Sequence, residues 1–218
     1  MTGSEGLLKQ REDTSKLREA VAMLASARRA NPRVFELEWR FARSSYFLGK
    51  QTTDKAEAST AFTQGRDAGE IASRLDPSRP DGYFWFAANL GELGRMERLT
   101  VGITSVPAIR TAMNKVLELQ PDYEKTSAYD ALALIELEMR MTGGSPEKAV
   151  EFLQKGLETE KDNVNLHLHL ATAFLALRKN DDARRELDTV LRMKPNPAYL
   201  VEYNAAVADA RKMLATRF

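Results

Sequence analysis

His167 and His169 are the two side chains in this chain best suited to binding a metal ion or moving a proton. On a β-strand, histidines separated by one residue share a face and could hold a zinc ion. On a helix the two rings point about 200° apart, so one ion cannot bind both. Because the surrounding residues have helical periodicity, the simplest interpretation is one packed and one exposed histidine, and the alternative is a lone metal ligand.

Other patterns that carry chemistry are absent from the sequence. Without cysteine there is no disulfide, no thiolate metal site and no cysteine nucleophile. No H-E-x-x-H, G-x-S-x-G, Walker or dinucleotide-binding glycine motif occurs. Residues 143–145 (Gly-Gly-Ser) are typical of a helix-capping turn rather than of an anion-binding nest. We therefore predict a protein that is not an enzyme, with no cofactor and no catalytic, cofactor-binding or metal-binding residue.

The charge balance argues against nucleic acid as a partner. The chain has 32 basic and 31 acidic side chains and a net charge of +1, whereas domains that bind nucleic acid are usually strongly basic. No segment reaches the roughly 18 apolar residues that a membrane-spanning helix needs. The first residues lack a basic segment followed by an apolar run, so either the protein is cytoplasmic or an export signal has been removed.

Prolines divide the sequence into about ten helices. Pro32, Pro77, Pro121 and Pro195 should each follow a helix end, because the residue before proline disfavours the helical conformation. Ser145 should cap a helix that has Pro146 at its first position. The only β-like stretch, residues 99–107, is short and contains Gly and Pro, so we expect a loop that leads into the next helix.

The helix ends also define a repeat. Residues 71–77, 115–121 and 189–195 are variants of one phrase, and Lys161 ends a fourth. The last interval is 34 residues, the period of the tetratricopeptide repeat (TPR). Ten residues after each of the first four ends lies an alanine, at positions 42, 87, 131 and 171. We expect an all-α, right-handed solenoid of about four TPR-like helix hairpins, closed by a capping helix over residues 197–214. The predicted organisation is a flexible segment at 1–12 and a single domain at 13–218.

In stacked hairpins the first helix of each pair lines the concave wall, so the alanines indicate which positions face inward. That wall is mostly apolar and predicts a hydrophobic cleft, a bound apolar small molecule or a docking face for a protein. The alternative is that the same side chains simply pack between helices. The predicted wall consists of Trp39, Arg43, Tyr46, Phe84, Ala88, Leu132, Ile135, Leu168, Thr172 and Leu175.

The segment Tyr83–Gly91 is the strongest concentration of aromatic residues. Four consecutive aromatics, at 83–86, cannot all face one core on a helix, so at least one must face a cleft, another helix or solvent. Asn89 lies among apolar neighbours and needs a hydrogen-bond partner if it is buried. We expect it to anchor the core rather than to bind a ligand.

Several phrases resemble the T-component family associated with TRAP transporters. They are residues 39–43, 46–49, 82–91, 107–110, 116–123 and 143–153, and together they span about residues 15–195. A second family, the regulators of microtubule dynamics, shares the helix-pair pattern and matches less closely.

The T-component resemblance implies a periplasmic protein, lipid-anchored in its full-length form, that docks a soluble substrate-binding protein. It also implies assembly into a homo-oligomer around a hydrophobic channel. This chain departs from the family in lacking a lipobox cysteine and in carrying Glu124–Ala128 where relatives have a glycine-richer turn. The alternative function is a general TPR adaptor that binds a peptide or helix of an unrelated protein, in the cytoplasm.

Overall fold

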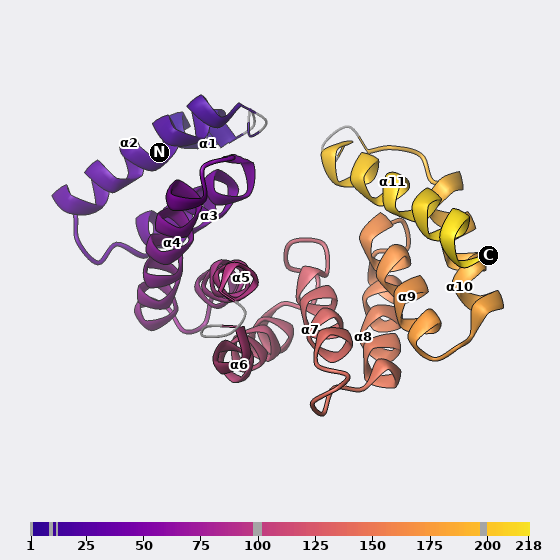
Figure 1. Cartoon of the computed structure of the whole chain (residues 1–218). Helices are drawn as coiled ribbons and strands as arrows, with labels where there is room; N and C mark the ends of the chain where they lie inside the picture. Colours follow the sequence, from indigo (N-terminus) through magenta and orange to yellow (C-terminus); the bar gives the residue numbers. More distant parts are fainter. Residues whose placement is uncertain (1, 9–10, 12, 98–101, 197–199) are drawn as a thin grey trace. The chain divides into compact units, whose positions relative to one another are not determined.

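In the computed structural model, every regular element of the described residues is an α-helix (Figure 1). The structure describes residues 2–8, 11, 13–97, 102–196 and 200–218. Among the described helices, none combines the length and the apolar character that crossing a bilayer requires. The helices are α1 (Thr2–Leu8), α2 (Thr14–Ala30), α3 (Phe35–Gln51), α4 (Lys55–Leu75), α5 (Pro80–Met96), α6 (Ile103–Leu119), α7 (Ser127–Glu138), α8 (Pro146–Thr159), α9 (Val164–Ala176), α10 (Asn180–Arg192) and α11 (Leu200–Arg217).

The predicted proline stops are confirmed. Helices α2, α4, α6 and α10 each end within three residues of Pro32, Pro77, Pro121 or Pro195. Ser145 caps α8 as predicted, because its hydroxyl accepts a hydrogen bond from the Lys148 backbone N–H at 3.2 Å. The loop predicted over residues 99–107 is partly wrong. Residues 99–101 lie outside the described part, but residues 103–107 belong to α6, and Pro107 lies inside that helix.

The helices pair as the repeat predicts. Helices α3 and α4, α5 and α6, α7 and α8, and α9 and α10 form four hairpins, and α11 packs against α9 and α10 as a cap. Three of the marker alanines, Ala42, Ala87 and Ala171, are buried. The third, Ala131, is only half-buried, whereas Ala128 and Ala133 are buried. Ala131 is therefore less buried than the alanines at the equivalent positions of the other hairpins.

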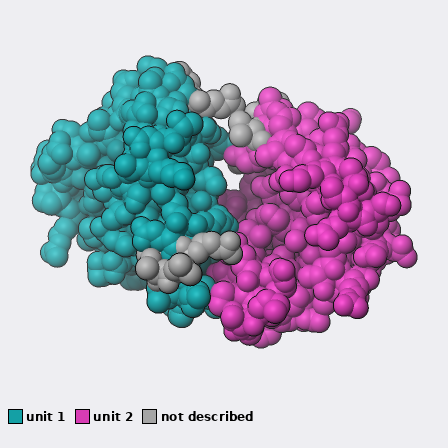
Figure 2. Space-filling model, viewed as in Figure 1, with its two compact units in different colours: residues 1–120 teal, residues 121–218 magenta. Residues whose placement is uncertain are grey.

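The chain divides into two compact units, residues 1–120 and residues 121–218 (Figure 2). Unit 1 contains α1–α6 and unit 2 contains α7–α11. A single domain over 13–218 stays a prediction. The segment 1–12, which we expected to be flexible, includes helix α1, in which Ser4 and Leu8 are buried.

Aromatic side chains from α3, α4 and α5 build the core of unit 1. The Trp85 ring lies 5.6 Å from the Tyr46 ring and 5.0 Å from the Phe84 ring, centroid to centroid. In the run of four aromatics, Phe84 and Trp85 are buried, whereas Tyr83 and Phe86 are half-buried, so the prediction that not all four could face one core is confirmed. Asn89 is fully buried and donates hydrogen bonds to the carbonyls of Ala42 and Trp85, as expected of a core anchor.

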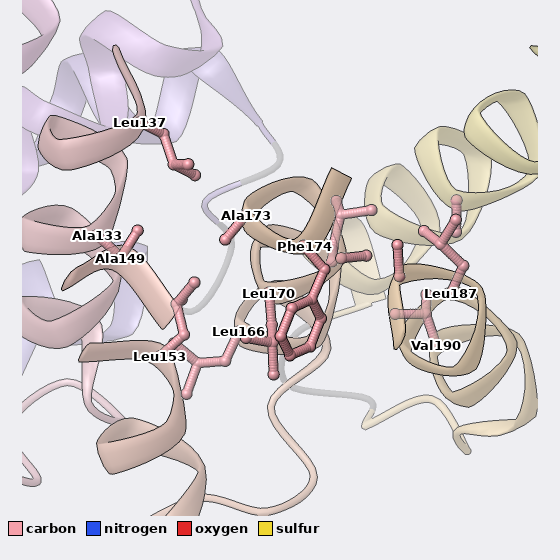
Figure 3. Close-up of a cluster of buried hydrophobic side chains, with 14 of the residues drawn as sticks. Ala133, Leu137, Ala149, Leu153, Leu166, Leu170, Ala173, Phe174, Leu187 and Val190 are labelled. Carbon is pink, nitrogen blue, oxygen red and sulfur yellow. The ribbon is translucent and has the colours of Figure 1, made fainter. Parts of the chain in front are cut away.

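Unit 2 has an aliphatic core. Figure 3 shows Leu166 of α9 pointing toward Leu153 of α8. Leu170 and Phe174 of α9 belong to the same cluster as side chains of α10 and α11. The core members are all nine-tenths or more buried, and they include Ala133, Leu137, Leu153, Leu166, Leu170, Ala173, Phe174, Leu187, Val190, Ala206 and Ala210. Burial of this apolar area, at about 25 cal/mol per Å², is the main stabilising term of the unit.

The two histidines link α9 to neighbouring helices. Nδ1 of His167 lies 2.6 Å from Oε2 of Glu186 in α10, and Nδ1 of His169 lies 2.6 Å from Oδ1 of Asp130 in α7. Both rings are half-buried, so the prediction of one packed and one exposed histidine is wrong. The rings nevertheless contact different helices, as their helical spacing requires.

The fit between α4 and α5 leads to a first prediction. A Cβ atom on Gly82 would lie 2.3 Å from the backbone nitrogen of Ser73, so Gly82→Ala forces the two helices apart. We expect it to lower the free energy of unfolding by about 2 kcal/mol or more. Gly91, on the same helix, has its nearest neighbour, Ile109 Cδ1, at 3.9 Å. Gly91→Ala should therefore be neutral or stabilising by up to about 1 kcal/mol. Urea denaturation of both variants measures this, and equal losses would contradict it.

A second prediction concerns pH. Burial lowers the pKa of His167, but hydrogen bonds to the Glu186 carboxylate and the Lys161 carbonyl outweigh burial and raise that pKa above 6.5. Protonation is thus favoured in the folded state. The stabilisation is complete below the unfolded pKa and is lost as pH rises through the folded pKa. Urea titrations from about pH 6 upward should show stability falling, and His167→Gln should flatten that dependence. An unchanged slope in the variant would contradict the assignment.

A third prediction follows from the turns after α2 and α9. Arg33 and Arg178 have positive φ angles of 62° and 60°. This left-handed conformation costs a non-glycine residue about 1–2 kcal/mol in the folded state. Glycine avoids that strain, but its greater conformational freedom in the unfolded state cancels about 0.5–1 kcal/mol of the gain. Arg33→Gly and Arg178→Gly should each leave the free energy of unfolding unchanged or raise it by up to about 1 kcal/mol. Urea denaturation of both variants measures the free energy of unfolding. A decrease in either variant would contradict the prediction and would show that the guanidinium itself stabilises the fold.

Candidate docking site

The predicted wall residues of unit 1 contact the chain's own elements. Trp39 and Phe84 are buried, and Arg43, Tyr46 and Ala88 are half-buried. Glu5 of α1 accepts hydrogen bonds from Arg40, at 2.8 Å, and from Arg43. The guanidinium of Arg43 also lies over the Trp39 ring, 4.8 Å from its centroid. Helix α1 therefore lies against the positions that the sequence predicted as an open wall.

The predicted wall residues of unit 2 are mainly packing residues. Leu132, Ile135 and Leu168 are buried, and half-buried Leu175 packs against the same core as Leu168. The hydroxyl of half-buried Thr172 donates to the Leu168 carbonyl at 3.1 Å. Five of the predicted residues belong to each unit, so a common wall that runs through both stays a prediction.

A hollow in unit 1 is the better candidate for a binding site. It has a volume of about 810 Å³ and lies among the C-terminal parts of α2 and α4, with α3 contributing Glu38 and Phe41. This volume is within the range of about 300–1,000 Å³ that is usual for binding pockets. Its lining residues are Ala25, Arg28, Arg29, Pro32, Arg33, Glu38, Phe41, Gln64, Ile71, Arg74 and Leu75.

Two ion pairs position α2 around this hollow. Near the N-terminal ends of α2 and α4, Arg18 donates to both carboxylate oxygens of Glu57, at 2.6 and 2.8 Å. Hydrogen bonds from Arg18 and then from Thr52 lower the pKa of Glu57 to about 2, so this link is ionised at neutral pH. At the other end, Arg28 donates to buried Glu38 at 2.8 Å, and its guanidinium lies 4.2 Å from the centroid of the Phe41 ring. The hollow lies beside this second pair.

The hollow is electropositive. Four arginines and one glutamate line it. Each helix C-terminus contributes about half a negative charge, so the ends of α2 and α4 together offset about one guanidinium. Glu38 offsets another through its pairing with Arg28. A positive charge of about two therefore remains around an apolar surface.

Sequence reasoning missed this site. Its basic residues have no catalytic pattern, and in a nearly neutral chain they do not stand out in composition. A signal was nevertheless present. Arg29 and Arg74 both lie three residues before a repeat proline, at Pro32 and Pro77, so they occupy equivalent positions in successive repeats.

Solved structures of similar fold include a TPR protein. A thermophilic TPR protein from Thermus thermophilus has a TM-score of 0.61 at 20% identity, with 89% of this chain and 92% of that chain covered. The structure of pilF of Pseudomonas aeruginosa has a TM-score of 0.64 at 15% identity, with 98% of this chain and 88% of that chain covered. A MamA double mutant gives 0.61, 15%, 94% and 92%. At these identities the likeness establishes the fold alone. The comparison with curated proteins found no match.

Two family models match the sequence. A tetratricopeptide-repeat model matches residues 141–201, in agreement with the predicted TPR-like fold. The model described as regulator of microtubule dynamics protein 1-3 matches residues 5–129, which include most of the phrases that resembled T-components. The T-component relationship itself stays a prediction. Since more than half of its length is matched, the chain belongs to the family of the regulators of microtubule dynamics proteins 1-3, the family to which the sequence analysis gave second place.

Proposed function

We propose that the chain is a non-catalytic adaptor that docks a protein partner in the hollow between α2 and α4. The observation that carries the proposal is the combination of arginines with the apolar side chains of Pro32, Ile71 and Leu75 in one lining. Such a surface suits a partner that presents apolar and charged groups together. A TPR-like fold supports this function, because stacked hairpins offer extended surfaces rather than an enclosed pocket.

The chemistry of the hollow supports docking over catalysis. Arginine remains protonated and cannot act as a general base. The one carboxylate of the lining, Glu38, is 4% exposed and paired with Arg28. Gln64 can form hydrogen bonds but cannot transfer protons at neutral pH. The lining therefore supplies recognition groups and lacks an available nucleophile or base.

The T-component resemblance gives a more specific form of the proposal. In that form the partner is a periplasmic substrate-binding protein, and the chain holds an apolar molecule or forms a homo-oligomer. The phrases at residues 82–91 and 143–153 support it. The family match over residues 5–129 supports the general adaptor instead, because the phrase at residues 82–91 lies within the part of the chain that matches another family. We therefore favour a partner unrelated to transport.

Site-specific photo-crosslinking in extract of the source organism tests the adaptor function. A benzophenone amino acid replaces Leu75, which lies in the lining and is 36% exposed, or Met141, which lies in unit 2 and is 86% exposed. We expect a protein to be captured at position 75 and not at position 141, and the captured protein, once purified, to bind the intact chain in a titration. Identical capture at both positions, or none at position 75, would argue against docking in the hollow.

A further inference from the structure

We infer that the segment bound in the hollow is an acidic peptide stretch that carries an apolar anchor residue. This inference rests on the proposed function and names the chemistry of the partner at the same site.

The arginines of the hollow differ in how far they are already paired. Arg28 is engaged with Glu38 and stacked on Phe41. Among the described residues, Arg74 is paired with Glu70 at 3.2 Å, an exposed ion pair that is worth little in water. Within the described part of the chain, neither Arg29 nor Arg33 forms an ion pair, and both are exposed. Two guanidiniums are therefore available, and a third is weakly engaged.

The positions of these arginines distinguish this hollow from the next repeat. Arg29 in α2 and Arg74 in α4 occupy the position three residues before the repeat proline. In α6 the equivalent position, before Pro121, is Glu118. In the next pair of helices, α4 and α6, the residue of α6 at this repeat position is thus negatively charged, whereas that of α4 is positively charged. Two arginines at this repeat position occur together only in the pair α2 and α4 of unit 1, and carboxylates are the peptide groups that guanidiniums bind best.

The apolar residues of the hollow add a second requirement. Ile71 and Leu75 line one side, and Pro32 contributes from the turn before α3. Phe41 lies beneath them and is already buried under Arg28. Leu75, the last residue of α4, is 36% exposed. A leucine or phenylalanine of the partner would bury this surface. An acidic stretch with one such residue therefore matches both the charge and the apolar lining.

The test uses a fluorescein-labelled peptide of two glutamates, a leucine, a phenylalanine and two glutamates, titrated with the whole chain by fluorescence anisotropy. The test variant is Arg29→Gln with Arg33→Gly. The matched control is Arg192→Gln with Arg178→Gly. Arg192 has the same repeat position in α10 as Arg29 in α2, and Arg178 has the same left-handed backbone as Arg33. Both doubles remove two positive charges and make the same residue changes, so net charge and backbone effects cancel.

We expect the test variant to bind the peptide at least about tenfold more weakly and the control to stay within about twofold of the unmodified chain. A peptide with glutamine in place of glutamate should lose binding to a similar extent. Affinity should also fall as salt rises. Circular dichroism of both doubles confirms that they are folded.

Three results would overturn the inference. The first is equal affinity of the two double variants, and the second is equal binding of the glutamine peptide. The third is a chain that does not bind the peptide but binds vesicles of phosphatidylserine and phosphatidylcholine, with that vesicle binding lost in the test variant. This result would assign the hollow to a lipid surface. If the peptide fails but crosslinking at position 75 still captures a protein, the adaptor function stands and only the acidic occupant is wrong.

Discussion

Asn89 is the point at which three helices of unit 1 are joined. Its amide donates to the Ala42 carbonyl of α3 at 3.1 Å and to the Trp85 carbonyl of its own helix at 2.7 Å. On α4, a Cβ atom at Gly65 would lie 2.3 Å from the Asn89 side-chain oxygen, so only glycine leaves room for this side chain. A buried amide without partners would cost about 1–3 kcal/mol. The separation of α3, α4 and α5 is therefore determined by one polar group and the space around it.

The hollow depends on that arrangement. Helix α3 contributes Glu38 and Phe41 to it, and α4 contributes Ile71, Arg74 and Leu75. Helix α2 is held against these two helices by the Arg18–Glu57 and Arg28–Glu38 pairs. A buried ion pair such as Arg28–Glu38 adds little net stability, since desolvation offsets its attraction. Its structural effect is to align α2, and it leaves Arg29 and Arg33 as the available cations.

Much of the fold could be predicted from local rules, and the places where prediction failed have physical reasons. Proline stops were correct because a steric clash within two residues decides them. Helix α7, which carries the half-buried Ala131, follows a turn in which Glu124, Lys125 and Thr126 all have positive φ angles. No glycine marks that turn. It is held from a distance by Asn163, whose side chain donates to the Lys125 carbonyl at 3.0 Å.

The candidate site was less predictable than the fold. Periodicity predicted that Trp39, Phe84 and Leu168 face inward, but it cannot distinguish a face that meets a partner from one that meets another helix. In the structure these side chains are buried. Arg29 and Arg74 share a repeat position but are one whole hairpin apart in the chain, so the periodicity of a single helix does not bring them together.

The helices, most of their ends and their pairing into TPR-like hairpins could be predicted from the amino-acid pattern, because these follow from contacts between residues near one another in the chain and from a repeated pattern. The tertiary structure alone decided which surfaces are covered and which remain open. Arg18 meets Glu57 across 39 residues, and Glu5 meets Arg43 across 38. Such contacts depend on how far apart packed helices lie, and this distance is set by individual side-chain volumes rather than by any local pattern.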